Sequence, residues 1–448
     1  MGTIKLFGTD GIRARAGEFP LDRGSVCALG EALAGVLRVS GLPAKVLVGR
    51  DTRESGVWME EIFINGIETG RGEAVSAGVI PTSAVSLLTR QHGFSAGVVL
   101  SASHNPYQDN GIKIFSAAGT KISEDWENEL EAAILRPRGA GPAGAAAVRP
   151  NGAFTDDYAG YLKGRFAAKA RFPRYRIVLD CANGAASAIA PLVFRDLGCD
   201  VLTIHDAPDG RNINLECGSL YPGSLVRGVR EFGADIGVAY DGDADRAVFV
   251  DETGRLLSGD HTLFIQARFM KDQGRLKGGT VVATTMSNMG LEEALRRMNL
   301  TLLRTRVGDK YVLEEMMKAG ANLGGEASGH TIFLDDCPTG DGILTSLKMV
   351  DAMADQRKSL SAMAAGYVEF PQVLVNVKVS AKPDFRDFPE ILAALDEIKT
   401  RLGDSGRVDL RYSGTEPLAR IMVEGRDENE VSRLAGRMAK VIAKCLGA

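Results

Sequence analysis

Ser103 is the first residue of this chain whose setting could support chemistry. It follows the apolar run 98–100, with His104 beside it and Lys113 further along the chain. A serine just after a buried strand lies at the edge where open α/β sheets bind ligands. The setting suits a hydroxyl that accepts a phosphoryl group and passes it on. The alternative is an ordinary Ser/Asn/Pro turn, which such residues also form.

Three aspartates at alternate positions form a second group. Asp241, Asp243 and Asp245 share a loop of small residues that ends at Arg246. Carboxylates this close repel one another unless a cation or solvent neutralises them, and a hard divalent cation takes oxygen ligands. An EF-hand calcium loop is excluded, because Arg246 stands where that loop needs glycine and strands are expected on both sides. The remaining alternative is an exposed acidic turn.

A glycine-rich loop at 324–330 carries a third group of polar side chains. It presents Glu326, Ser328 and His330 with little bulk around them. These groups suit hydrogen bonding to a polyhydroxylated ligand, although Gly/Ser loops with one acid are common. The segment 307–312, which contains Gly308, could shape the same site.

A turn near the C-terminus combines guanidinium groups, hydroxyls and backbone N–H groups. Its residues are Arg411, Ser413, Gly414, Thr415 and Arg420. Clustered N–H groups bind anions, and arginine binds phosphate through two parallel hydrogen bonds. The turn therefore predicts a phosphate site, with a plain hairpin turn and surface arginines as the alternative.

Apolar runs that end in small or polar residues must position these loops. They predict strands at 45–51, 75–80, 98–100, 176–180, 235–240, 247–250, 280–285, 370–379, 407–411 and 419–424. Helices are expected at 26–37, 52–70, 124–135, 156–169, 344–353 and 388–402, from 429, and in the stretches that end at 197 and 298. The order of elements repeats three times, so three α/β units would each bring one loop (101–106, 241–246 or 325–330) to a common cleft. Chance similarity among βα units is the alternative.

Composition limits the remaining options. The chain has 448 residues, a formal charge of −4 and six scattered cysteines without a Cys-x-x-Cys pair. Near-neutral charge favours neither a nucleic-acid partner nor a membrane partner, and reduced cysteines favour the cytoplasm. No signal peptide or membrane-spanning run is evident. The Gly/Ala/Pro-rich stretch 136–150 predicts a loose connection between domains.

Taken together, these motifs resemble the α-D-phosphohexomutase superfamily, and within it the phosphoglucosamine mutase branch of bacteria. The matching segments are Phe-Gly-Thr-Asp-Gly-Ile-Arg at 7–13, Ser-Ala-Ser-His-Asn-Pro at 101–106, Asp-Gly-Asp-Ala-Asp-Arg at 241–246, Gly-Glu-Ala-Ser-Gly-His at 325–330 and Arg-Tyr-Ser-Gly-Thr-Glu-Pro at 411–417. Their order covers nearly the whole chain. Two positions depart from that branch: Ala327 where Gln is usual, and Ala244 where Gly is common. The second adds only a methyl group, which we expect the loop to accept.

The resemblance implies four domains around a central cleft. Three similar mixed α/β domains, 1–150, 151–252 and 253–366, would carry the phosphoserine, metal and sugar-binding loops. A smaller α+β domain of the TATA-binding-protein type, 367–448, would carry the phosphate-binding loop.

The resemblance also implies a reaction, the interconversion of glucosamine 6-phosphate and glucosamine 1-phosphate for cell-wall precursor synthesis. Phosphorylated Ser103 would give its phosphoryl group to the sugar, forming a bisphosphate that turns over and returns the other phosphoryl group. One Mg²⁺ per chain would be held by Ser103, Asp241, Asp243 and Asp245, with a sugar bisphosphate as primer. Substrate would contact Arg246, Gly308, Glu326, Ser328, Arg411, Ser413, Gly414, Thr415 and Arg420. Arg13, His104, Lys113 and His330 are candidates for proton handling, and Lys113 could act as a base only with a lowered pKa.

Other functions remain open at this point. A phosphomannomutase or phosphoglucomutase of the same superfamily would differ only in its sugar. A catalytically silent sugar-phosphate-binding protein is a second alternative, against which the intact serine and aspartates argue. The expected partner is a small sugar phosphate, and the sequence leaves the oligomeric state open, with a homodimer as one option.

Overall fold

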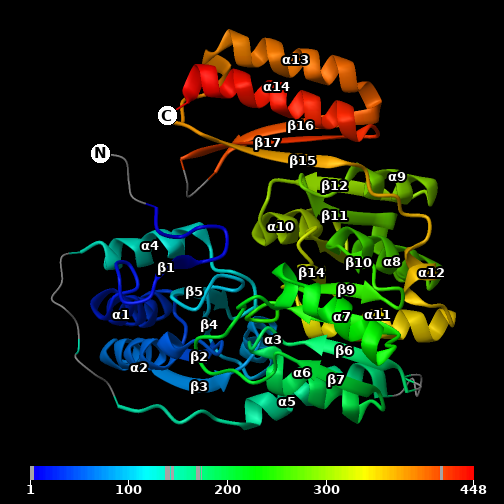
Figure 1. Ribbon diagram of the computed structural model, residues 1–448. Coiled ribbons are helices and arrows are strands. Elements are labelled where there is room, and N and C mark those ends of the chain that lie inside the picture. Colours follow the sequence, from blue (N-terminus) through cyan, green and yellow to red (C-terminus); the bar gives the residue numbers. More distant parts are fainter. Residues whose placement is uncertain are drawn as a thin grey trace. The chain divides into compact units, whose positions relative to one another are not determined.

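The computed structural model describes residues 5–136, 142, 146–167, 172, 174–413 and 417–447 (Figure 1). The chain divides into two compact units, each described by itself below. The first comprises Met1–Thr284 and Leu303–Ala365, and the second comprises Thr285–Leu302 and Gly366–Ala448. Most of the connection expected at 136–150 lies outside the described residues.

The first sheet has five strands in the order β1-β5-β4-β2-β3. These are β1 (Ile12–Arg15), β2 (Lys45–Arg50), β3 (Glu73–Val79), β4 (Ala96–Leu100) and β5 (Asp109–Ser116). Strands β2, β3 and β4 are parallel, whereas β5 runs antiparallel to β4 and β1 antiparallel to β5. The helices are α1 (Arg23–Val39), α2 (Glu54–Thr69), α3 (Thr82–Gln91) and α4 (Glu124–Ile134).

Alternation along the strands sorts their side chains between two helical layers. Val46, Val48, Val98 and Leu100 join the apolar core shared with α1, α2 and α4. On the other face Gly49 and Gly97 leave room for α3, because a Cβ at Gly49 would stand 2.6 Å from Val85. The buried strand β4 therefore ends at Leu100 between two packed layers, and Ser101 follows it, as the sequence predicts.

The second sheet repeats this order as β10-β9-β8-β6-β7. Its elements are α5 (Ala153–Ala167), β6 (Arg176–Asp180), α6 (Ala186–Asp196), β7 (Asp200–Ile204), the short 3₁₀ helix η1 (Gly218–Leu220), α7 (Gly223–Phe232), β8 (Ile236–Tyr240), β9 (Ala247–Asp251) and β10 (Leu256–Leu257). Strand β6 is parallel to β7 and β8, and β9 is antiparallel to β8. The loop 241–246, called the metal loop below, thus follows β8 in the same way as the loop 101–106, called the Ser103 loop, follows β4.

The third sheet, β12-β11-β13-β14, keeps the same arrangement with one strand fewer. Its elements are α8 (Gly259–Asp272), the 3₁₀ turn η2 (Lys277–Gly279), β11 (Thr280–Thr284), β12 (Thr301–Thr305), α10 (Asp309–Ala319), β13 (Leu323–Gly325), β14 (Thr331–Phe333), α11 (Gly342–Gln356) and α12 (Leu360–Ala364). Strand β13 is parallel to β11 and antiparallel to β14. In all three sheets the polar loop joins the same two strand positions, so the internal repeat predicted from the sequence is confirmed.

The second unit contains a three-stranded antiparallel sheet in the order β15-β17-β16. Its elements are α9 (Met289–Arg297), β15 (Gln372–Lys378), the 3₁₀ helix η3 (Phe385–Asp387), α13 (Pro389–Leu402), the 3₁₀ helix η4 (Gly403–Ser405), β16 (Gly406–Tyr412), β17 (Leu418–Gly425) and α14 (Glu428–Leu446). Alternate residues of β17, Ala419, Ile421 and Val423, share a buried core with α13 and α14. This is the α+β arrangement expected for the C-terminal region.

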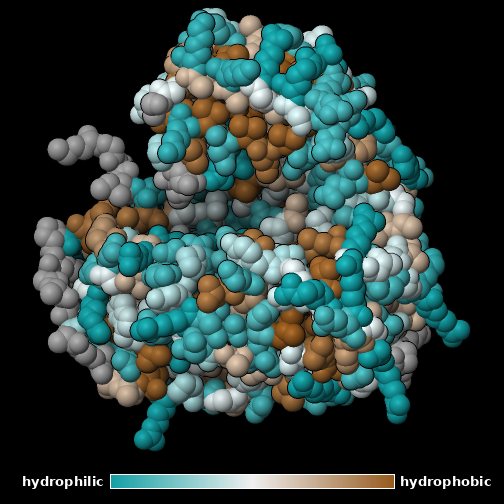
Figure 2. All heavy atoms as spheres, viewed as in Figure 1, coloured by the Kyte–Doolittle hydropathy of each residue, from teal (hydrophilic) through white to brown (hydrophobic). Residues whose placement is uncertain are grey.

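All the strands and helices predicted from the sequence are present, with ends that differ by a few residues. No strand or α-helix with stated bounds was predicted at β1, β5, β7, β10, β12, β13, β14, α3, α7, α8, α10 or α12. On the face of the first unit seen in Figure 2, hydrophilic and near-neutral residues predominate, and hydrophobic residues form separate patches. Among the described residues, no helix has the length and apolar character needed to cross a membrane.

Candidate active site

The Ser103 loop is held in an unusual backbone conformation. Ser103 has a φ of 51° and its side chain is fully buried. A non-glycine residue in this left-handed region is uncommon and persists where its surroundings fix it. The N–H of Ser103 donates to Ser101 Oγ at 2.9 Å, and its carbonyl accepts from Arg53 at 3.0 Å and from Asn214 at 2.8 Å.

The metal loop lies directly against the Ser103 hydroxyl. Ser103 Oγ donates to Asp241 Oδ2 at 2.6 Å. Ligand oxygens of Asp241, Asp243 and Asp245 all lie within 4.8 Å of one another, and all three residues are buried. The structure therefore brings together two loops that stand far apart in the sequence, one from each of the first two sheets.

The aspartate trio fits a hard divalent cation. Asp243 Oδ1 and Asp245 Oδ1 are buried without a hydrogen-bond partner among the described residues. Burial raises the pKa of Asp241 well above its ordinary value, and the charges of Asp245 and Asp243 raise it further. Buried oxygens that lack donors and repel one another are the donor set that Mg²⁺ prefers.

Lys113 is an ion-pair partner of these aspartates. Its Nζ lies 2.8 Å from Asp243, 3.0 Å from Asp245 and 2.9 Å from Asp10. Burial alone would lower the pKa of Lys113, but these three carboxylates outweigh it and raise the pKa well above its ordinary value. A general-base role needs a lowered pKa, so this geometry does not support that candidate role. Lys113 is instead a fixed cation whose Nζ binds Oδ2 of Asp243 and Oδ2 of Asp245.

His104 lies beside the reactive hydroxyl in neutral form. Its Nδ1 is 3.3 Å from Ser103 Oγ. Burial, together with the nearby cations Arg246 and Arg13, lowers its pKa to about 3. Arg246 Nε lies 3.9 Å from Asp241 and 3.8 Å from Asp245. Arg13, on β1, is half-buried and paired with Asp10.

The glycine-rich loop of the third sheet adjoins the same aspartates. His330 Nδ1 lies 3.6 Å from Asp245 Oδ1, and Gly340 N–H donates to Nε2 at 3.0 Å. Burial would lower the pKa of His330, but Asp245, Asp309 and Glu326 raise it to about 9. A pKa this high would place a second proton on Nε2, but Nε2 already accepts the Gly340 N–H. This direct contact therefore favours the neutral ring, with its proton on Nδ1.

The sugar-loop residues lie at the surface end of this arrangement. Glu326 Oε1 accepts the Gly308 N–H at 3.2 Å, which brings together two residues predicted to contact substrate. Glu326 is half-buried and Ser328 is exposed. Their side chains are therefore open to a ligand that approaches from solvent.

Two small residues let the metal loop approach the Ser103 loop. A Cβ at Gly242 would stand 2.6 Å from the Ser103 carbonyl oxygen and 2.9 Å from Asn214 Nδ2. Ala244 is buried with a φ of 56°. The sequence-based view that Ala244 adds only a methyl group is therefore incomplete, because alanine also carries a cost of about 1 kcal/mol in the left-handed region.

We expect Gly242→Ala to lower turnover about 10²-fold, since the new methyl group must displace a backbone oxygen and with it Ser103. Ala244→Gly is the matched control. Its relief of backbone strain is offset by the lost buried methyl group and the added freedom of the unfolded chain, so stability should change by less than about 1 kcal/mol. Steady-state kinetics and thermal melting of both variants check this, and equal activities would contradict it.

The predicted phosphate turn belongs to the second unit. Arg411 and Arg420 are directly opposite on the paired strands β16 and β17. Ser413 is buried, and its carbonyl accepts from Lys382 at 2.6 Å. Gly414 and Thr415 lie outside the described residues. Like charges directly opposite on a sheet repel, so this pair suits a bound anion.

Several residues of the site were not predicted from the sequence. Arg53 is fully buried and pairs with Asp51 at 2.9 Å, and Thr82 Oγ1 donates to Asp243 at 2.5 Å. Asn214 reaches the Ser103 loop from the second sheet. One sequence feature could have indicated these residues: the first strands of the first two α/β units both end in an aspartate, Asp51 and Asp180. In each copy Oδ1 of this aspartate accepts the N–H two residues on, from Arg53 and Ala182 respectively, at 3.0 Å.

Comparisons with known protein families assign all four parts of the chain. Four domain families of phosphoglucomutase/phosphomannomutase match in order: the alpha/beta/alpha domains I, II and III at residues 4–138, 156–254 and 258–370, and the C-terminal domain at 374–441.

Curated relatives match along almost their whole length. A phosphoglucosamine mutase of Koribacter versatilis is 48% identical over 99% of this chain and 97% of the relative. A phosphoglucosamine mutase of Deinococcus radiodurans is 45% identical over 98% and 97%.

Solved structures agree in fold. A phosphoglucomutase/phosphomannomutase family protein of Burkholderia thailandensis, 21% identical, superposes with a TM-score of 0.79 over 98% of this chain and 97% of the other. The Aspergillus fumigatus N-acetylphosphoglucosamine mutase, 20% identical, gives 0.70 over 99% and 96%. The motifs, the three repeated sheets and the full-length matches together show that this chain belongs to the phosphoglucomutase/phosphomannomutase family of α-D-phosphohexomutases.

Proposed function

We propose that this protein interconverts glucosamine 6-phosphate and glucosamine 1-phosphate through a phosphorylated Ser103. The observation that carries the proposal is the contact of Ser103 Oγ with Asp241, at 2.6 Å, beside two further buried aspartates. Identities of 48% and 45% to proteins named phosphoglucosamine mutase support the choice of sugar.

The reaction exchanges one phosphoryl group for another. The free hydroxyl of the sugar phosphate attacks phosphorus on phosphorylated Ser103, and the bond between phosphorus and Ser103 Oγ breaks. The hydroxyl loses its proton and Oγ gains one, which leaves a sugar bisphosphate and unmodified serine. After the bisphosphate turns over, Ser103 Oγ attacks the other phosphate and regenerates the phosphoenzyme. A trace of sugar bisphosphate primes enzyme that has lost its phosphoryl group.

A single Mg²⁺ would be held by Asp241, Asp243, Asp245 and an oxygen on Ser103. When bound, it would neutralise charge on the transferring phosphoryl group. The chain's own cations add to this: Lys113 binds Oδ2 of Asp243 and Oδ2 of Asp245, and Arg246 stands beside Asp241. The Arg246 side chain is 17% exposed, and its guanidinium suits contact with a phosphoryl oxygen.

His104 lies beside Ser103 Oγ, with Nδ1 at 3.3 Å. Because Oγ donates its own proton to Asp241, the neutral ring with its proton on Nδ1 can donate a hydrogen bond to Oγ and help to orient it. Arg13 and His330 are paired with Asp10 and Asp245 respectively, so they orient carboxylates around the site. We assign none of these side chains to proton transfer at the sugar hydroxyl.

Substrate recognition is divided between two loops. Glu326 and Ser328, with the Gly308 backbone, would hold the sugar hydroxyls and amino group. The opposed pair Arg411 and Arg420, with Ser413, Gly414 and Thr415, would bind the phosphate that is not reacting. We propose that the domains 1–150, 151–252, 253–366 and 367–448 each contribute one of these four loops.

The compartment and assembly follow from the same proposal. We place the activity in the cytoplasm, where sugar phosphates are made, and all six cysteines are free thiols. The partners are small sugar phosphates, with no nucleic acid or membrane required, and a homodimer is compatible with the activity.

The test is a coupled assay with Mg²⁺ and a trace of hexose 1,6-bisphosphate. Glucosamine, glucose and mannose 6-phosphates are supplied separately to the same enzyme preparation. We expect kcat/KM for the glucosamine compound to exceed the other two by at least about tenfold, because a carboxylate such as Glu326 distinguishes an ammonium from a hydroxyl.

Two other results would change the assignment. Faster turnover of glucose or mannose phosphate would identify a phosphoglucomutase or phosphomannomutase. No turnover of any of them, with no phosphate on Ser103 after priming, would favour a silent sugar-phosphate-binding protein.

A further inference from the structure

The backbone of the Ser103 loop is fixed by two side chains that donate to the same two carbonyls. Arg53 donates to the carbonyls of Ser103 and Asn105 at 3.0 and 2.8 Å. Asn214 Nδ2 donates to the same carbonyls at 2.8 and 3.1 Å. The four hydrogen bonds hold the Ser103–His104 and Asn105–Pro106 peptide units. We call Arg53 and Asn214 the carbonyl clamp.

Arg53 is itself immobilised. It is fully buried, its Nε lies 2.9 Å from Asp51 Oδ2, and its backbone N–H donates to Asp51 Oδ1 at 3.0 Å. Asp51 also accepts from Ser101 Oγ at 2.6 Å, and Ser101 Oγ accepts the Ser103 N–H at 2.9 Å. One buried ion pair therefore holds both the N–H and the carbonyl of Ser103.

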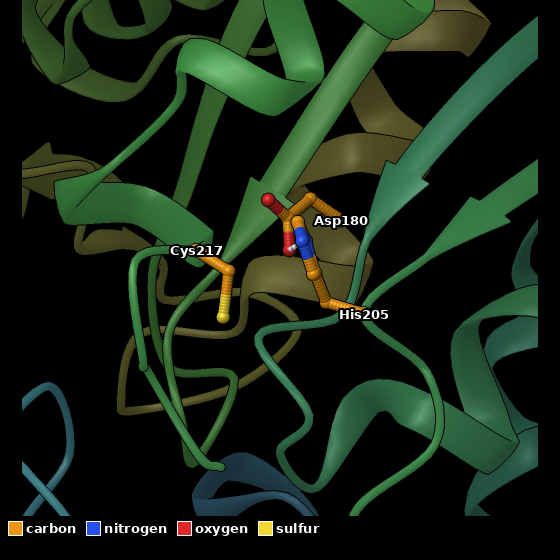
Figure 3. Close-up of side chains that lie close together, drawn as sticks. All are labelled: Asp180, His205 and Cys217. Atoms are coloured by element: carbon orange, nitrogen blue, oxygen red, sulfur yellow. Dashed lines mark ion pairs between the residues drawn. The ribbon is translucent and has the colours of Figure 1, made fainter.

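Asn214 arrives from the second sheet on a segment that begins at His205 and ends at Gly218. Asp180 closes the base of this segment: its Oδ1 lies 3.1 Å from His205 Nδ1, and its Oδ2 accepts the Gly218 N–H at 3.0 Å. Figure 3 shows His205 turned toward Asp180, with Cys217 beside them. Asp180, His205 and Cys217 could together hold a metal ion. Because both Asp180 oxygens already contact His205 or the Gly218 N–H, we interpret this group as contacts that hold the two ends of the segment together.

The clamped carbonyl also lies against the metal loop. The Ser103 oxygen is so close to Gly242 that a Cβ there would stand 2.6 Å away. A buried carbonyl needs donors, and this one finds them in Arg53 and Asn214. Any shift of that carbonyl moves Ser103 Oγ relative to Asp241.

We propose that Arg53 and Asn214 are positioning residues for phosphoryl transfer: they hold Ser103 in its left-handed conformation, so that the group on Oγ stays aligned with the aspartate trio. The role rests on the proposed function, because it matters only if Ser103 carries a phosphoryl group. The clamp joins the first two domains at the reacting residue, and neither of its members touches the sugar.

Asn214→Gly tests the clamp. Asn214 has a φ of 58°, which glycine adopts without strain, so this variant removes the amide and spares the fold. Asn212→Gly is the matched control, since Asn212 lies in the same segment and its Nδ2 donates to Ala207 at 3.0 Å, away from the Ser103 loop. Arg53 stays unchanged, because removing a buried ion-pair partner could unfold the protein.

Three quantities are measured on the full chain: the rate of Ser103 phosphorylation by glucose 1,6-bisphosphate, followed by intact-protein mass spectrometry, and kcat and KM for glucosamine 6-phosphate. We expect Asn214→Gly to slow phosphorylation and kcat about 10²-fold, with KM within about twofold of wild type. The Asn212→Gly control should stay within about threefold in all three.

The proposal is overturned if Asn214→Gly phosphorylates Ser103 as fast as the control, or if its loss of kcat only matches a loss of folded protein. If wild type is phosphorylated and prefers another hexose phosphate, the sugar assignment fails while the clamp is still tested on that sugar. If wild type takes no phosphate at Ser103, the proposed function and the clamp fail together.

Discussion

Replacing Ser103 with alanine is expected to lower mutase turnover by at least about 10³-fold while sugar phosphate still binds. The Ser103 hydroxyl donates to Asp241 and is the group proposed to carry the phosphoryl group. The proposed phosphate and sugar contacts come from other loops, so binding should persist. The coupled assay gives turnover, and calorimetric titration with glucosamine 6-phosphate gives affinity.

Ser116→Ala is the matched control for this prediction. Ser116 is also in the first domain, at the end of β5, and its Oγ lies 3.0 Å from Thr120 Oγ1. It should keep wild-type turnover. Substantial activity in Ser103→Ala, or an equal loss in both variants, would contradict the assigned role.

Asp241→Asn is expected to separate stability from activity. Three buried carboxylates repel one another in the metal-free protein, so neutralising Asp241 should raise the melting temperature without Mg²⁺. The same change removes a cation ligand and should lower turnover at least about 10²-fold. Adding Mg²⁺ should raise the melting temperature of wild type and leave that of the variant nearly unchanged.

Melting curves with and without Mg²⁺, and with EDTA as the reference, check this second prediction. Asp251→Asn serves as control, because this buried aspartate at the end of β9 binds the turn that follows and lies outside the trio. That variant should lose stability while keeping the Mg²⁺ response. An Asp241→Asn variant that still melts higher with Mg²⁺ would show that the cation binds elsewhere.

The sequence located the reactive loops because their residue types carry the chemistry. Ser103, the three aspartates and the Glu326 loop all follow short apolar runs, and a buried strand constrains where the next residues lie. The internal repeat then predicted which loops would meet. For the first three sheets, local pattern and order along the chain were sufficient to place these residues.

The residues that hold the loops were not predicted, since their roles depend on burial. Arg53 directly precedes helix α2 in a charged stretch and resembles a solvated arginine, yet it is fully buried. Lys113 faces Asp10, which only pairing of β1 with β5 brings close. Sequence alone gives neither environment, so it could not give the direction of the Lys113 pKa.

The missed helices have similar physical causes. Helix α3 is buried from Thr82 to Thr89, so it lacks the polar face that makes helical periodicity visible. Helix α7 starts after Pro222 and contains Gly228, both of which indicate turns when only the sequence is known. Tertiary packing, which pattern does not show, decides these segments.

One measurement tests the central claim that Ser103 carries the transferred phosphoryl group. Wild-type enzyme is charged with phosphate-labelled hexose 1,6-bisphosphate, freed of excess label, and mixed with unlabelled glucosamine 6-phosphate in a rapid chase. The account predicts that the label lies on the peptide containing Ser103 before the chase and leaves it for the sugar at a rate no slower than kcat. Label on another residue, or label that stays on Ser103 while product forms, would contradict it.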